Sequence, residues 1–273
     1  DAHALGHAVT AGQHEIESAQ VERFDRARKE WQIIAERLRG QRQQLNRRCV
    51  DAARFDDPGN RAWTMEQGKQ LGVRKHVQHL LEHASGLPAH RPYYQSRRGR
   101  ASFEIGICEE PLAYLPRTDS IYSDPGFMLL GFALENAAAT PLDKQFDAWR
   151  DRDPGADVEF RYRPPQDWFG RTAPTEDTSL GDERRGVVHD ENADALDGVA
   201  AHAGLFGTAA AVGACARWWM RSAQLPLFAK KTSVPRSSRA LAWDTMLPTS
   251  SCGTKLSTSA IGHTGFTGTS LWL

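Results

Sequence analysis

The sequence predicts a mixed α/β (α+β) fold, and three observations support this class. Apolar residues recur at helical spacing over residues 19–50, 73–83 and 209–220, which is the pattern of helices packed by one face. Residues 126–135 form a continuous apolar stretch typical of a buried helix. At the end of the chain, residues 261–273 carry apolar side chains suited to a strand, interrupted by three glycines.

The composition excludes several classes of protein. The 273 residues include 34 basic and 34 acidic side chains, so no chain-wide attraction to nucleic acid or to an anionic membrane is expected. Apolar runs stay well short of the ~20 residues that a membrane helix needs, so no membrane span is predicted. The first residues show no basic-then-apolar signal pattern, which favours the cytoplasm slightly and otherwise leaves compartment and oligomeric state open.

Four widely spaced cysteines show no C-x-x-C pairing, and free thiols are favoured over a structural disulfide: Cys49, Cys108, Cys215 and Cys252.

The first predicted helix, over residues 19–50, is amphipathic and its outer face is strongly basic. One interpretation is an arm for an acidic partner; the other, a solvated helix packed by its apolar face, is favoured. The polar junction 56–60, which contains Pro and Gly, ends this segment.

The next predicted helix runs over residues 73–83, with Gly86 as its C-cap, and residues 89–121 are expected to be rich in loops. Its histidines, at spacings that share one helix face, are His76, His79 and His83. A structural role for them is favoured over a zinc site, because no fourth ligand is specified nearby, and no metal is predicted.

Tyr122 and Asp124 come just before the buried helix predicted over 126–135. Residues two apart in an extended segment share one side, so both side chains could point into one cleft. Asp124 could equally be the N-cap of the helix, and the residues alone favour the cap.

Residues 140–198 hold most of the Pro, Asp and Gly and are expected to be loops with short helices. The run His189-Asp190-Glu191 fits either ligands and a general base or turn and cap chemistry. Small residues around His202 indicate close backbone approach.

Four segments, taken in chain order, resemble motifs of the serine beta-lactamase and penicillin-binding-protein superfamily, in its beta-lactamase-related esterase branch. They are VRKHVQHLLEHASGLPAHRPYY, YSDPGFMLLG, the group APTE with RGVVHDENA and GVAAHAGLFGT, and GHTGFTGTSLW. The resemblance covers residues 73–273 and implies an antiparallel sheet flanked by helices together with a mainly helical region. The implied organisation is an atypical segment at 1–50, a mainly helical region at 51–200 and a sheet region at 201–273 with the His-Thr-Gly strand.

The resemblance also implies an activity and a set of site residues. Such enzymes transfer an acyl group to a serine and hydrolyse a small ester, a beta-lactam or a D-amino-acid amide, without a metal or organic cofactor. Tyr122 corresponds to the proton carrier, and Asp124 to the residue that orients the lysine and the substrate amide. His263 and Thr264 match the third motif, which holds a substrate carboxylate or tunes the proton network. Gly265 is expected to leave room for substrate, and the backbone N–H of Phe266 is expected to form half of an oxyanion hole.

The nucleophile of this family, the Ser of a Ser-x-x-Lys motif, has no counterpart in the chain. No serine lies between Ser18 and Ser85, and no serine anywhere is followed by lysine three residues later. In the nearest local likeness, Arg28 takes the nucleophile position and Trp31 the lysine position. The alternative prediction is therefore a non-catalytic or truncated homologue that uses its cleft for binding.

Overall fold

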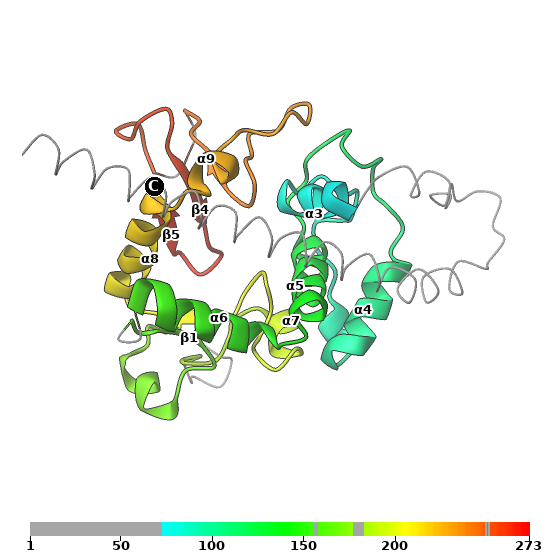
Figure 1. Cartoon of the computed structure of the whole chain (residues 1–273). Coiled ribbons are helices and arrows are strands. Elements are labelled where there is room, and N and C mark those ends of the chain that lie inside the picture. Colours follow the sequence, from blue (N-terminus) through cyan, green and yellow to red (C-terminus); the bar gives the residue numbers. More distant parts are fainter. Residues whose placement is uncertain (1–72, 156–157, 177–182, 249, 251) are drawn as a thin grey trace, which may run out of the picture.

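The computed structural model describes residues 73–155, 158–176, 183–248, 250 and 252–273, and the helix predicted over residues 19–50 lies outside this part. Helices make up most of the first half of the described chain, and a small antiparallel sheet forms its C-terminal end (Figure 1). The mixed class predicted from the sequence is confirmed. None of the described helices has the length and apolar character required to cross a bilayer.

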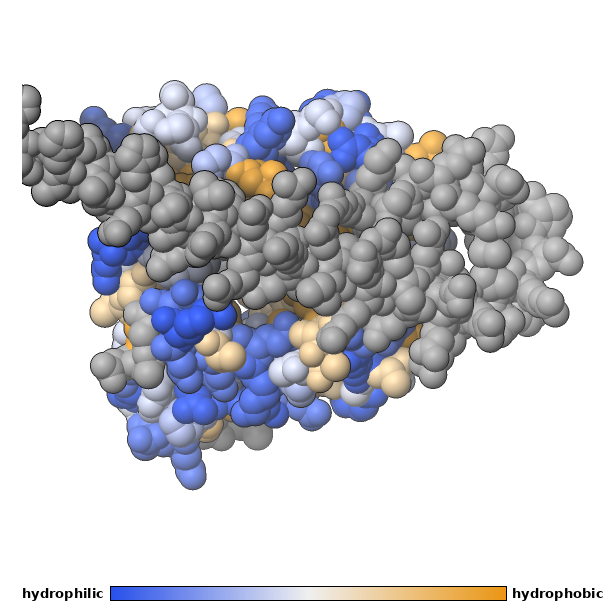
Figure 2. Space-filling model, in the orientation of Figure 1, coloured by the Kyte–Doolittle hydropathy of each residue, from blue (hydrophilic) through white to orange (hydrophobic). Residues whose placement is uncertain are grey.

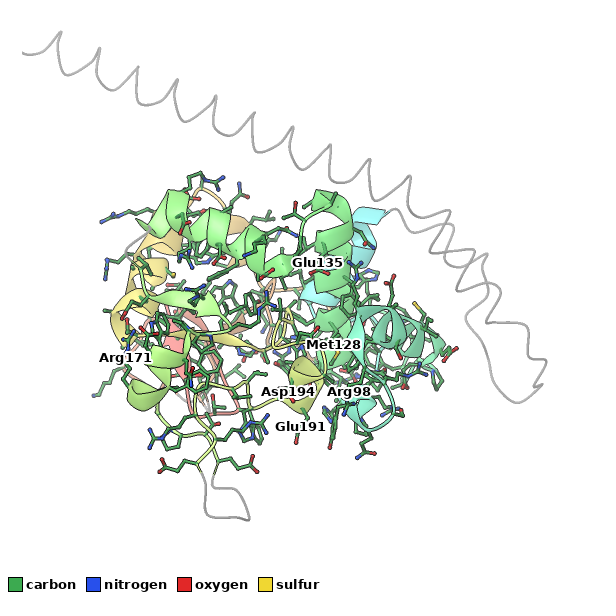
Figure 3. The ribbon with its side chains drawn as sticks, turned by 90° about the horizontal axis from the view of Figure 1, so that it is seen from below. Arg98, Met128, Glu135, Arg171, Glu191 and Asp194 are labelled. Carbon is green, nitrogen blue, oxygen red and sulfur yellow. The ribbon has the colours of Figure 1, made fainter. Side chains whose placement is uncertain are left out.

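Helix α5 (Asp124–Ala138) is the centre of the helical part, and both α3 (Val73–Leu81) and α4 (Gly99–Glu109) pack against it. Its inner face is apolar and includes Met128, which is buried and labelled in Figure 3. The core around it combines side chains of these helices with those of the segment that follows residue 187. Its largest fully buried apolar members are Phe103, Ile107 and Met128. This packing fixes the N-terminal end of α5, where the candidate site begins.

The middle of the chain alternates short elements with loops, as expected. In chain order the elements are η1 (Tyr93–Gln95), α6 (Leu142–Arg150), the π-helical turn η2 (Asp151–Gly155), β1 (Phe160–Tyr162), η3 (Gln166–Arg171), α7 (Glu191–Asp194), β2 (Leu205–Gly207), α8 (Ala209–Arg221) and α9 (Leu225–Phe228). Strands β1 and β2 pair antiparallel, with Arg161 opposite Phe206. The helix predicted over 209–220 is confirmed as α8, which begins at the cap Thr208.

The C-terminal sheet has the order β3-β4-β5 and is antiparallel throughout, with β3 at Asp244–Thr245, β4 at Ile261–Thr264 and β5 at Ser270–Trp272. The single closing strand predicted from the sequence is wrong, because the chain reverses between β4 and β5. The Gly265 amide donates to the Thr269 carbonyl (2.7 Å) and the Gly268 amide to the Gly265 carbonyl (3.1 Å). Gly268 has a φ of 83°, which glycine adopts without strain. The glycines therefore make a hairpin rather than a weakened strand.

Two further predictions need correction. Helix α3 ends at Leu81 rather than His83, so His83 lies in the turn beyond the helix and Gly86 is not the C-cap. The loop-rich segment 89–121 contains the regular helix α4, which the sequence hides because Arg98 at its N-cap makes no capping hydrogen bond through its side chain. Arg100 near the start of this helix pairs with Glu135 of α5 (3.0 Å).

On the face in view in Figure 2, the part drawn in colour is mixed. Hydrophilic residues (blue) alternate there with weakly and strongly hydrophobic ones (pale to deep orange). This agrees with the ordinary charged content of the sequence, 25%.

Candidate active site

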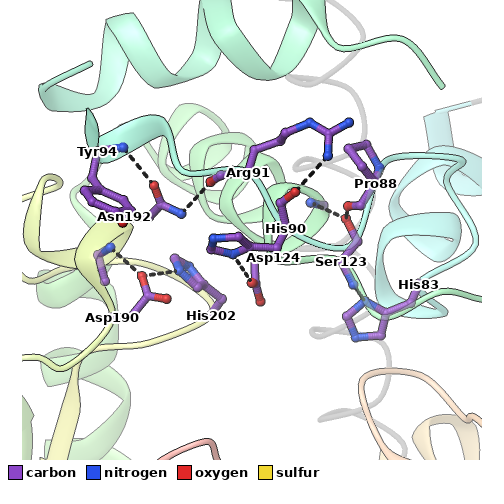
Figure 4. Close-up of polar contacts among 12 residues, drawn as sticks. His83, Pro88, His90, Arg91, Tyr94, Ser123, Asp124, Asp190, Asn192 and His202 are labelled. Carbon is purple, nitrogen blue, oxygen red and sulfur yellow. Dashed lines mark hydrogen bonds and ion pairs between the residues drawn. The ribbon is translucent and has the colours of Figure 1, made fainter. Parts of the chain in front are cut away.

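The N-terminus of α5 carries the first part of the site. Ser123, not Asp124, is the N-cap: its Oγ accepts the Gly126 amide (3.1 Å) and donates to the Pro88 carbonyl (2.7 Å). The favoured interpretation of Asp124 as the cap is therefore wrong. Asp124 lies at the first helical position, and its Oδ2 is 3.2 Å from Nδ1 of His90 (Figure 4). Its carboxylate serves no capping role and remains accessible to chemistry.

Tyr122 brings together three segments that are far apart in the sequence. Its ring lies 4.5 Å from the His83 ring and 5.7 Å from the His263 ring, measured between centroids. The guanidinium carbon of Arg239 lies 5.4 Å from the centre of the same ring, a cation-π contact. Partial burial raises the pKa of Tyr122, the charge of Asp124 raises it further, and Arg239 acts in the opposite direction. The phenol is therefore protonated at neutral pH.

His83 is buried directly beneath this tyrosine. Its Nδ1 accepts the Ser123 amide (3.0 Å), and its ring also stacks on Phe127 with a centroid distance of 4.6 Å. Burial first, then the charges of Arg239 and His263, lower the pKa of His83 to about 3. The ring is thus neutral, and because Nδ1 accepts a backbone N–H, the hydrogen-bond network assigns its proton to Nε2.

The hairpin β4–β5 forms the opposite wall of the site. His263 is opposite Leu271 in the ladder, and its Nδ1 donates to the Thr264 carbonyl (2.8 Å), so Nε2 is the ring nitrogen left for other partners. Thr264 is exposed at the end of β4. Nδ1 is thus occupied by the backbone, and Nε2 is the nitrogen available to the site.

Gly265 and Phe266 occupy the turn of this hairpin. A Cβ on Gly265 would lie 2.4 Å from the Thr269 hydroxyl, so the bare position has a packing reason within the hairpin itself, in addition to the substrate contact expected from the sequence. Phe266 is 93% exposed, and its ring lies 5.5 Å from the His189 ring. The hairpin therefore contacts both the Tyr122 side and the His189 side of the site.

A second carboxylate and imidazole pair lies beside the first. Oδ1 of Asp190 caps α7 by accepting the Ala193 amide (2.7 Å), and it also lies 2.9 Å from Nε2 of His202, whose side chain is 2% exposed. Burial acts to raise the pKa of Asp190, but the hydrogen bond and charge of His202, the Ala193 amide and the charge of His90 together hold that pKa below its usual value. The capping interpretation of Asp190 is confirmed, and the ion pair with His202 was not foreseen.

Close backbone approach around His202 is confirmed. A Cβ on Gly204 would lie 2.5 Å from the Gly198 carbonyl oxygen, and Gly204 has a φ of 116°. The neighbouring Asn192 is fully buried and bridges to the η1 segment, accepting the Tyr94 amide (3.0 Å) and donating to the Arg91 carbonyl (2.9 Å). This bridge fixes Asp190 relative to His90 (Figure 4).

The structure thus brings Tyr122, Asp124 and His263 to one region, as the sequence predicts. Reasoning from sequence missed His90 and Arg239, and it gave His83 no part in the site. No group of three His, Cys, Asp or Glu side chains within the described residues is arranged to hold a metal ion. Ser123 is 1% exposed, and its hydroxyl both donates and accepts a hydrogen bond, so it cannot serve as the nucleophile.

Comparisons with known proteins converge on one family. The family model described as Beta-lactamase matches residues 50–273. A putative D-alanyl-D-alanine carboxypeptidase of Escherichia coli O157:H7 is 29% identical over 232 residues, which covers 71% of this chain and 52% of that protein. An N-acetylmuramyl-L-alanine amidase of Bacillus subtilis (strain 168) is 30% identical over 230 residues, or 70% of this chain and 51% of that protein. The chain spans about half the length of the curated relatives it matches.

A solved structure supports the same fold. EstCE1, a hydrolase with promiscuous acyltransferase activity, superposes with a TM-score of 0.55 at 18% identity, over 88% of this chain and 73% of that one.

Proposed function

Because the chain belongs to the beta-lactamase family, within the serine beta-lactamase and penicillin-binding-protein superfamily, we propose that its site is built for acyl transfer to and hydrolysis of a small ester or amide. The observation that carries the proposal is the meeting of Tyr122 with His263 at 5.7 Å, on the side of the site where Asp124 begins α5. Esters, beta-lactams and D-amino-acid amides share the carbonyl group that such a site would recognise.

The proposed roles follow from the state of each group. Tyr122 is a neutral phenol and would give its proton to the leaving group. His263 lies next to it, and its Nε2 would take the proton that the attacking group gives up and pass it to Tyr122, which replaces the proton that the phenol has lost. Asp124 would orient the polar end of the substrate, and its negative charge is compatible with a substrate N–H donor.

The hairpin supplies the proposed carbonyl contacts. The amide N–H of Phe266 would donate to the developing oxyanion, and Gly265 would let the substrate approach the backbone. Thr264 is exposed beside them and would hydrogen-bond a substrate carboxylate or amide. His263 in place of the lysine that many transpeptidases carry favours a hydrolase or esterase over a cell-wall transpeptidase, by analogy within the family.

A second candidate, a non-catalytic homologue that binds carbonyl compounds in the same cleft, is favoured by one specific observation. No serine in the 273 residues is followed by lysine three residues later, so the chain does not supply the family's nucleophile motif. We also propose the division of the chain into an atypical segment at 1–50, a mainly helical region at 51–200 and a sheet region at 201–273.

Covalent labelling separates the two candidates. The purified chain would be incubated with a fluorescent penicillin, a fluorophosphonate and an activated short-chain ester, and any adduct located by peptide mass mapping. A stoichiometric adduct on a serine, lost or slowed in Tyr122→Phe but not in the matched control Tyr94→Phe, supports the hydrolase. No adduct and no burst of ester cleavage leaves the binding homologue as the conclusion.

A further inference from the structure

His83 occupies a backbone position that a side chain rarely takes. Helix α3 ends in a left-handed turn, in which the His83 amide donates to the Leu80 carbonyl (3.1 Å) and the Ala84 amide to the His79 carbonyl (2.7 Å). His83 itself has a φ of 51°, where glycine is the usual residue. A buried side chain kept at such a position suggests a role that glycine could not fill.

The contacts of His83 with residues 121–123 indicate this role. Its carbonyl accepts the Ile121 amide (3.0 Å), its Nδ1 accepts the Ser123 amide (3.0 Å), and its ring lies 4.5 Å from that of Tyr122 between them. Three consecutive residues are thus fixed by one histidine. The His83 ring also stacks on Phe127, with ring centroids 4.6 Å apart, and this second ring contact helps to hold it in place.

The carbonyl of His83 is further anchored by a side chain. The Tyr114 hydroxyl donates to it (2.8 Å), which satisfies its second lone pair. The turn that carries His83 is therefore bonded to Tyr114 and to residues 121–123, so its orientation does not depend on α3 alone.

We propose that His83 is the positioning residue for Tyr122: it fixes the backbone on both sides of the tyrosine and packs its ring against that of Tyr122. The catalytic meaning of this inference rests on the proposed function, whereas the positioning can be measured without turnover. The charged and titratable groups that act on Tyr122 are Asp124, Arg239, Asp244 and Asp190, and His263 lies against its ring. A cationic ring beneath Tyr122 would add to Arg239 and favour the phenolate, so a neutral His83 helps to keep the phenol protonated.

Two substitutions separate the acceptor atom from the ring. His83→Asn keeps an oxygen near Nδ1 that can accept the Ser123 amide but removes the stacked ring. His83→Phe keeps a ring but removes the acceptor. The ionisation of Tyr122 would be followed by phenolate absorbance, assigned by difference from Tyr122→Phe, and the exchange of the Ser123 amide would be followed by NMR.

The two variants are expected to fail differently. In His83→Phe the Ser123 amide loses its partner and exchanges faster, by roughly tenfold or more. In His83→Asn that amide stays protected, but Tyr122 titrates at lower pH, because partial burial is the largest cause of its raised pKa and the ring that provides part of it is gone. In an active chain either variant would lower kcat more than it changes KM.

Ala139 provides the control for a changed residue in a left-handed turn. It has a φ of 50°, is exposed, and is the C-cap of α5, at the other end of the helix from Tyr122. Ala139→Asn and Ala139→Phe should leave both readouts at their wild-type values. The inference is overturned if folded His83→Asn, the milder variant, leaves the Tyr122 titration unchanged, or if the Ala139 variants reproduce its shift.

Failure of this inference is distinguishable from failure of the proposed function. A wild-type chain that forms no acyl adduct, but in which Tyr122 responds to His83→Asn, retains the positioning and loses the hydrolase. A chain that forms an adduct, but in which Tyr122 does not respond, retains the hydrolase and loses the positioning.

Discussion

Replacing Ser123 with alanine tests how the site is held together, because one hydroxyl joins two segments. Its Oγ accepts the Gly126 amide at the start of α5 and donates to the Pro88 carbonyl, and the residue is 1% exposed. Ser123→Ala therefore removes a helix cap and leaves a carbonyl of a buried residue without this donor. Both losses act next to Tyr122 and Asp124.

The expected magnitude follows from those two losses. A lost N-cap costs about 1 kcal/mol of unfolding free energy. A buried carbonyl left without a partner costs about 1–3 kcal/mol more. The free energy of unfolding should therefore fall by about 2–4 kcal/mol, which for a chain of this size lowers Tm by roughly 4–16 °C.

Thr208→Ala is the matched control, because Thr208 caps α8 through a single bond to the Ala211 amide (3.1 Å). It should cost about 1 kcal/mol, or roughly 2–4 °C. Urea unfolding followed by circular dichroism would give both values, with an unchanged m-value confirming that only stability has changed. If Ser123→Ala costs no more than Thr208→Ala, the bond to Pro88 contributes nothing and the reasoning is refuted.

Three further predictions use the same structure. Asp190→Asn retains the cap and the bond to His202 but removes the charge. Because the folded-state pKa of Asp190 is lowered, its contribution to the free energy of unfolding is complete above about pH 4 and is lost as the pH falls below that value. Urea titrations should therefore show a smaller loss of stability from pH 6 to pH 3 in the variant than in the wild type, and equal losses would contradict the assignment. Gly265→Ala places a Cβ 2.4 Å from the Thr269 hydroxyl and should lower the free energy of unfolding by about 1–3 kcal/mol. The double variant Gly265→Ala/Thr269→Ala should recover this stability. If it also recovers ester cleavage, the substrate role of Gly265 is wrong. Arg239→Gln removes the cation 5.4 Å from the centre of the Tyr122 ring and also frees Asp244 from its 2.7 Å bond to Arg239. Both changes should raise the pKa of the Tyr122 phenol, measured by absorbance. A lowered pKa would contradict this reasoning.

The sequence predicted the elements whose signal is local. The buried helix at 126–135, the helix at 209–220 and the loops between residues 140 and 198 each carry their own periodicity or turn residues, and tertiary contacts only extended them. Helix α4 was missed because it is held from outside itself: the Gly99 amide donates to the Ala195 carbonyl (3.1 Å), and Arg100 pairs with Glu135. Such contacts join residues too far apart in sequence to leave a local pattern.

The site residues divide in the same way. Tyr122, Asp124 and His263 could be named from motifs, but their partners His90 and Arg239 could not, because neither lies at a spacing that links it to the tyrosine. The choice of Asp124 over Ser123 as the cap shows how small the error can be. Both residues are good N-caps, and in the structure the Ser123 hydroxyl accepts the Gly126 amide and is also bonded to the Pro88 carbonyl, 35 residues away.

The proposed acyl-transfer site has two halves. The proposed proton-transfer half, with Tyr122, His263 and Asp124 next to His83, is organised by α5 and the hairpin β4–β5, and its geometry does not depend on a nucleophile. The nucleophile half is carried by another part of the chain in the family, and this sequence offers no Ser-x-x-Lys to supply it. Tyrosine titration and covalent labelling therefore examine independent halves: an ordered Tyr122 without an adduct defines a binding homologue, and an adduct would identify a serine that the family motif does not predict.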